Sequence, residues 1–230
     1  SITVTNWTLA LLTSALTFHW RRAAQVITNG FALLSAAWIL GHLIVPSTVF
    51  IGPTLFEKNF VYVPSPSRLV GVATSFFAHS MVAAREPEPT PLLRNGWVGL
   101  TLQGVLPKFT DALGAVAAWG WIGLLAVGTW GMLRDKGPAR VPLTIGLFLL
   151  AQFGLHSVYG EETFLYSLHW LPFLVMTAAY GCRSKARYGV LAATCLLTVL
   201  VAVVNYQALY AATERALEMN AERVRTVGAR

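Results

Sequence analysis

Long apolar runs, separated by short charged or turn-rich connections, dominate the hydrophobic pattern of this chain. A helix needs about 20 mostly apolar residues to cross the hydrocarbon core of a bilayer, and six runs come close to that length. They predict membrane-spanning helices over residues 2–20, 24–45, 113–133, 141–157, 164–182 and 188–206. Because the runs are continuous and do not alternate between apolar and polar residues, they argue against a transmembrane β-barrel.

The amino-acid composition supports a membrane protein. Hydrophobic residues make up 55% of the 230 residues and charged residues 12%, whereas a soluble domain has about 25% charged residues. The mean hydropathy is +0.58. A soluble fold of this size could not bury so much apolar surface, which excludes a water-soluble enzyme, a disordered chain and a disulfide scaffold. We expect an all-α, polytopic membrane protein that forms a single membrane domain over residues 1–230.

The charges in the loops predict the orientation of the spans, since cytoplasmic loops carry an excess of Lys and Arg. The loops after the first, third and fifth spans are short and basic, and the loop after the fourth contains Glu161 and Glu162 but no base. Alternation then places the basic loops in the cytoplasm and both termini on the extracytoplasmic side. The net charge of +7 lies largely in these loops, so it is no argument for nucleic-acid binding.

The connection over residues 46–112 is expected outside the membrane. It contains a further apolar stretch, Leu69–Ala84, which is short for a span and includes several polar residues. If this stretch crossed the bilayer, two basic loops would face outward, so we expect an outer interfacial or a re-entrant helix. Beyond it, Pro at alternate positions in residues 87–91 forbids a helix and favours extended chain.

Both ends of the chain carry further expectations. The tail, residues 207–230, has the composition of a helix, and we expect a solvent-exposed helical extension of the sixth span. The N-terminal run does not resemble a secretory signal peptide, because Arg21 and Arg22 follow it instead of preceding it. The absence of an initiator Met leaves two explanations open, which are Met removal and a chain cut from a longer protein.

Glycines are frequent in the third span, where we expect them to permit close packing with a neighbouring helix. They are Gly114, Gly120, Gly123, Gly128 and Gly131. The two cysteines, Cys182 and Cys195, are not part of a CxxC motif, and a disulfide between them is not expected.

Polar side chains gather where the fourth span ends and the fifth begins. Glu162, Tyr166 and His169 lie four and three residues apart, which places them on one face of an α-helix. Residues of these types suit general acid–base chemistry or the orientation of a sugar or phosphate head group. The candidate substrate-binding residues are His156, Glu161, Glu162, Tyr166, His169 and Trp170.

Two other interpretations of this cluster stay open. In the first, the glutamates cap a helix, the aromatic residues belong to the membrane-interface belt and His169 bonds a neighbouring helix. In the second, the histidines and glutamates bind a metal ion, although their spacing matches no zinc motif. His79 is a further candidate for the same site, while Trp38 and His42 are expected to be packing residues. No metal or cofactor is expected.

Three stretches of sequence occur together in this chain. Residues 3–7 open a span that ends at Arg21-Arg22, residues 159–169 read YGEETFLYSLH, and the sixth span ends at Asn205. Together they resemble the C-terminal half of bacterial GT-C-type membrane glycosyltransferases, the group that includes protein mannosyltransferase-like proteins. The resemblance implies an inverting transfer of a sugar from a polyprenyl-phosphate-linked donor, on the extracytoplasmic face of a bacterial inner membrane.

One departure from that family limits what the resemblance implies. The family carries its catalytic acid in the first extracytoplasmic loop of an N-terminal half that these 230 residues do not contain, so no catalytic residue is assigned. Two hypotheses follow, a glycosyltransferase-like protein (or its C-terminal part) and a non-enzymatic membrane subunit of a larger assembly or transporter. The expected partners are membrane lipid, a polyprenyl-phosphate sugar donor and a partner membrane subunit, without nucleic acid.

Overall fold

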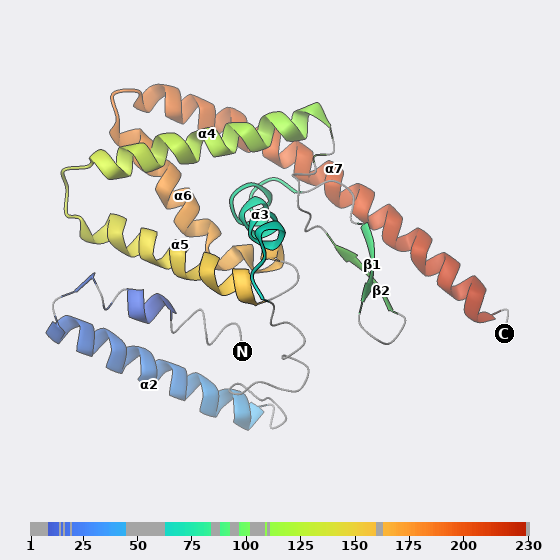
Figure 1. Cartoon of the computed structure of the whole chain (residues 1–230), viewed down its shortest axis with the longest axis horizontal. Coiled ribbons are helices and arrows are strands. Elements are labelled where there is room, and N and C mark those ends of the chain that lie inside the picture. Colours follow the sequence, from blue (N-terminus) through green and yellow to red (C-terminus); the bar gives the residue numbers. More distant parts are fainter. Residues whose placement is uncertain are drawn as a thin grey trace.

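The structure, a computed structural model, is predominantly helical (Figure 1). It describes residues 9–13, 15, 17–18, 20–44, 63–83, 88–92, 97–101, 109, 111–159 and 163–228. The longer helices are α2 (Trp20–Ile44), α4 (Ala112–Arg134), α5 (Arg140–Val158) and α7 (Arg187–Gly228). The shorter elements are α3 (Pro66–Thr74), η2 (Ser75–His79), β1 (Glu88–Leu92), β2 (Trp97–Thr101), η3 (Thr163–His169), α6 (Leu171–Ala179) and η4 (Tyr180–Arg183).

Three of the described helices are long and apolar enough to cross a membrane, namely α4, α5 and the part of α7 from Arg187 to Glu222. They support membrane integration, but they are fewer than the six spans predicted. The α2 helix coincides with the second predicted span, whereas only parts of the first lie within the described residues. The expected tail helix is confirmed, because α7 continues without a break to Gly228 (red in Figure 1).

The fifth predicted span, residues 164–182, is not one uninterrupted α-helix. It is divided into the 3-10 helix η3, the nine-residue helix α6 and the 3-10 helix η4. Pro172 lies in the first turn of α6. A proline lacks the N–H that would continue a preceding helix and clashes with the chain before it. The helical ladder therefore restarts after Trp170, whose carbonyl accepts the amides of Phe173 and Leu174.

Residues 66–83, called the inserted segment below, lie against several other helices. Ser65 caps α3 by accepting the amide of Arg68, and Pro66 occupies the first helical turn, where a missing N–H costs nothing. The chain then packs against α5, α4 and η3 (Figure 1). Most of its second half is buried, with Phe76 and Val82 at 0% exposure, whereas Phe77 is 38% exposed. The segment therefore contacts other helices of the protein along its second half, and both predicted alternatives, an interfacial helix and a re-entrant one, stay predictions.

The proline-rich chain forms a short antiparallel hairpin, with Glu88 opposite Thr101 and Leu92 opposite Trp97. Extended structure was predicted here, but its pairing with β2 was not. The prolines of β1 stand at alternate positions, so their missing amides all fall on one edge of the strand. The other edge keeps its N–H groups for the partner strand.

The glycines of α4 differ in how closely another part of the chain approaches them. A Cβ at Gly128 would clash with the carbonyl of Thr177, and one at Gly131 would lie 2.7 Å from the carbonyl oxygen of Tyr180. These two glycines therefore let α4 approach α6 and η4 closely, as predicted. A Cβ at Gly123 would meet nothing within 4 Å, so the prediction does not extend to that position.

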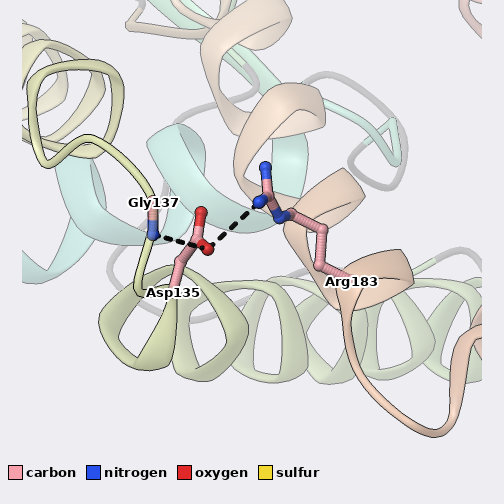
Figure 2. Close-up of polar contacts among 3 residues, drawn as sticks. All are labelled: Asp135, Gly137 and Arg183. Atoms are coloured by element: carbon pink, nitrogen blue, oxygen red, sulfur yellow. Dashed lines mark hydrogen bonds and ion pairs between the residues drawn. The ribbon is translucent and has the colours of Figure 1, made fainter.

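An ion pair joins the turn after α4 to the end of η4. Nη2 of Arg183 lies 3.2 Å from Oδ1 of Asp135, and the same carboxylate oxygen accepts the amide of Gly137 at 3.1 Å (Figure 2). The pair therefore links two of the basic loops that the sequence places on the same side of the membrane.

Candidate functional site

The structure brings four of the predicted site residues together at the end of α5. The imidazole of His156 stacks on the ring of Tyr166, with centroids 5.2 Å apart and an interplanar angle of 22°. It also lies 4.7 Å from the ring of Trp170, at 58°. His169 follows at 6.4 Å from Tyr166. Glu161 and Glu162 lie outside the described residues.

The sequence predicted Glu162, Tyr166 and His169 on one face of an α-helix. The prediction of an α-helix is wrong here, but Tyr166 and His169 still lie on the same side. Thr163–His169 form a 3-10 helix, which has three residues per turn. Positions three apart therefore coincide, and this keeps Tyr166 and His169 on one side. Nδ1 of His169 lies 3.0 Å from the carbonyl oxygen of Tyr166. Since a carbonyl oxygen only accepts hydrogen bonds, Nδ1 is the donor in this contact.

His156 is the most unusual member of the cluster. Its side chain has 0% exposure. Neither ring nitrogen makes a hydrogen bond of good geometry within the described part of the chain, although the backbone of Tyr159 lies close by. Buried polar groups without a partner are rare in native structures and call for an explanation, such as a catalytic role or an absent ligand or water.

Sequence reasoning missed Arg68, which brings a permanent positive charge to the cluster. Its Nε donates to the carbonyl of Ser157 at 3.0 Å and its Nη2 to that of His156 at 3.5 Å. The last carbonyls of a helix have no partner within the helix and carry partial negative charge, so the guanidinium from α3 is well placed at the end of α5. The sequence signal was a lone base at the start of an otherwise apolar stretch.

Trp170 is a core residue. Its exposure is 0%, its ring stacks on Phe76 at 4.6 Å and 9°, and its Nε1 donates to the carbonyl of Phe76 at 3.4 Å. Trp121 makes the equivalent bond to the next carbonyl, that of Phe77, at 2.8 Å. The two indoles thus hold the π-helix η2 in place, and Trp170 is neither a membrane-interface aromatic nor an open contact surface.

The far end of the inserted segment is held by Asn205, the residue that ends the sixth predicted span. Its amide donates to the carbonyl of Met81 at 3.0 Å and accepts the amide of Ala83 at 2.7 Å. His79, the further candidate, pairs instead with the carbonyl of Val82 at 3.1 Å and lies against Phe109. The structure gives His79 no ring contact with the cluster around His156.

The remaining members of the cluster can act as donors and as stacking surfaces. Tyr166 is half-buried and lies outside the three long apolar helices, and burial raises the pKa of its phenol, which stays protonated at neutral pH. The guanidinium, imidazoles and phenol suit recognition of an anionic oxygen beside a ring that stacks on aromatic faces. Within the described residues, no three His, Cys, Asp or Glu side chains are grouped to hold a metal ion.

The side chains of Trp38 and His42 lie outside the described part of the structure, so their packing role stays a prediction.

Comparison of the chain with protein-family models, with curated proteins and with solved structures gave no match.

Proposed function

We propose that this chain is a GT-C-like membrane glycosyltransferase, or the C-terminal part of one. In this proposal Arg68, His156, Tyr166 and His169 bind the phosphate and the sugar of a polyprenyl-phosphate-linked donor on the extracytoplasmic face. The observation that carries the proposal is the environment of His156. Its imidazole is fully buried, makes no hydrogen bond of good geometry to a described residue, and lies against the rings of Tyr166 and Trp170 and near the guanidinium of Arg68.

Charge supports the assignment of the phosphate. A phosphate ester is anionic, and Arg and His donors form short, charge-assisted hydrogen bonds to it. Arg68 is held by the carbonyls at the end of α5, so its charge is fixed in position before a ligand arrives. The half-buried rings of Tyr166 and His169 offer a face on which a sugar can stack.

The chemistry of the proposed transfer balances as a single displacement. A hydroxyl oxygen of the acceptor attacks the anomeric carbon, the bond from that carbon to the phosphate oxygen breaks, and polyprenyl phosphate leaves with the electron pair. Negative charge grows on the leaving oxygen, where donors already in place stabilise the transition state. The group that takes the proton of the hydroxyl is not assigned to a described residue, and Glu161 and Glu162 stay candidates from the sequence.

Binding and transfer of a radiolabelled polyprenyl-phosphate sugar by the full-length native protein test this proposal. We expect His169→Ala, His156→Gln and Glu162→Gln to reduce transfer at least tenfold while the helical circular dichroism is retained. Leu168→Ala is the matched control, because Leu168 lies in the same 3-10 helix and is 80% exposed. Full activity in the histidine variants would refute the assigned site.

A second candidate function is a non-enzymatic membrane subunit. The observation in its favour is that much of the polar chemistry near the cluster is spent on structure, with Arg68, Trp170 and Asn205 all bonding backbone groups. An intact mass near 25.0 kDa for the protein from its own membrane, with a larger protein co-purifying, would favour the subunit. A mass about twice as large would favour an enzyme whose catalytic loop lies upstream.

A further inference from the structure

A cavity of about 610 Å³, half open at the surface of the protein, lies between α4, the α6–η4 segment and α7, and no residue of the cluster around His156 lines it. Trp121 and Leu124 of α4 form one wall, residues 175–182 of α6 and η4 form the second, and residues 191–202 of α7 form the third. Cavities of about 300–1,000 Å³ are the size that holds small ligands. This cavity is therefore large enough for a molecule and is not a packing defect.

The lining of this cavity is apolar and therefore suits hydrocarbon better than water. Its only hydroxyl groups belong to Thr194 and Thr198, which already bond the carbonyls of Val190 and Thr194 at 2.8 and 2.9 Å. A buried water needs two to four polar partners, and an apolar cavity in a protein stays dry or takes an apolar ligand. In a bilayer, the acyl chains of the surrounding lipids can occupy such a cavity.

The length of the cavity matches one leaflet. Its wall on α7 runs from Leu191 to Ala202, which spans about 16 Å at the helical rise per residue. The hydrocarbon core of a bilayer is about 30 Å thick, so the wall covers roughly half of it. A single acyl chain of a phospholipid extends over the same half.

One end of the cavity meets a strongly basic surface. Cys182 and Leu191 line this end, and the chain between them exposes Arg183, Lys185 and Arg187. The ion pair of Arg183 with Asp135 brings the exposed Arg134 and Lys136 to the same side. The acid among them, Asp135, is engaged by Arg183 (Figure 2). Groups of four to eight bases beside a membrane helix recognise anionic lipid head groups. The charge at the mouth therefore complements a lipid phosphate.

We propose that this cavity binds one acyl chain of an anionic glycerophospholipid, with the phosphate against the basic surface and the chain running along α7 toward Trp121 and Met81. The lipid belongs to the leaflet on the Arg183 side. It is a structural partner, and this inference does not depend on the proposed glycosyl transfer.

Native mass spectrometry of the full chain tests the inference, using nanodiscs with equal amounts of phosphatidylglycerol and phosphatidylcholine. We expect one phosphatidylglycerol per chain to survive release from the disc. Thr198→Trp fills the cavity and should lower that adduct at least tenfold. Val199→Trp is its control, because Val199 is also exposed on α7 but does not line the cavity.

A second pair covers the case in which the first variant does not fold, as judged by circular dichroism and gel filtration. Ala202→Trp lines the cavity and Val203→Trp does not. Lys185→Gln combined with Arg187→Gln should abolish the preference for phosphatidylglycerol over phosphatidylcholine. An adduct that persists in the cavity-filling variants, equal retention of both lipids by the unaltered protein, or displacement of the lipid by added polyprenyl phosphate would overturn the inference.

Discussion

The ring of Trp170 lies parallel to the ring of Phe76, 4.6 Å away, across a separation of 94 residues in the chain. This contact joins the start of α6 to the middle of the inserted segment. The ring centroid of the same tryptophan also lies 4.7 Å from that of His156. The candidate site and the inserted segment therefore share one supporting residue.

The first prediction concerns that shared residue. Trp170→Ala should lower the free energy of unfolding by about 3–5 kcal/mol, the range for removing a large buried aromatic side chain. Trp170→Phe keeps a ring for stacking but loses the Nε1 bond to the carbonyl of Phe76 and part of the buried ring volume, so its cost should be smaller than that of Trp170→Ala. Denaturant titration in micelles, followed by circular dichroism, measures both. Equal losses would contradict the importance of the stack.

The second prediction concerns the contact between α4 and α6. Gly128→Ala places a methyl group against the carbonyl of Thr177, and overpacking of this kind costs about 1–3 kcal/mol. Gly123→Ala is the matched control on the same helix, because its Cβ meets no atom within 4 Å. Alanine is the better helix former, by about 1 kcal/mol, so the control should be neutral or stabilising. Thermal unfolding of the two variants in the same detergent compares them directly.

The third prediction concerns the end of the inserted segment. Asn205→Ala removes the partners of the Met81 carbonyl and the Ala83 amide, and leaving buried backbone groups unpaired costs about 1–3 kcal/mol. Hydrogen exchange at Ala83 should become faster, which reports the loss at the bond itself. Asn220→Ala, on the exposed tail of the same helix, should leave that exchange rate unchanged. Unaltered exchange at Ala83 in Asn205→Ala would show that Asn205 does not hold the segment.

The fourth prediction separates stability from function at His156. Replacing a buried polar group that lacks good partners by an apolar group of similar shape is neutral or stabilising, so His156→Phe should unfold no earlier than the unaltered protein. The same variant should lose binding of a polyprenyl-phosphate sugar, measured by retention of radiolabelled lipid. A marked loss of stability would instead indicate that His156 has a structural partner.

Local pattern was enough to predict several elements. The apolar runs located α2, α4, α5 and α7 to within a few residues, and the periodic tail was found as a continuation of α7. The alternating prolines predicted extended chain where β1 lies. These predictions are confirmed because the length of an apolar run and the geometry of proline depend on residues that are close together in the sequence.

Local rules left open what distant chain segments decide. The sequence predicted an interfacial or a re-entrant helix over residues 69–84, and in the structure the indoles of Trp121 and Trp170 and the amide of Asn205 hold residues 76–83 against other helices. Likewise, the sequence around Arg68 does not predict its bonds to the carbonyls at the end of α5. These carbonyls lie 88 and 89 residues further along the chain.

By itself, the sequence determined that this is a helical membrane-type chain, where most of its helices run and which residues could supply a polar site. Only the tertiary structure decided that His156, Tyr166 and Trp170 meet, that Trp170 is a core residue and that an apolar cavity opens beside a basic surface. The physical reason is that helix formation follows from neighbouring residues, whereas burial and pairing of polar groups depend on which surfaces the packed chain brings together.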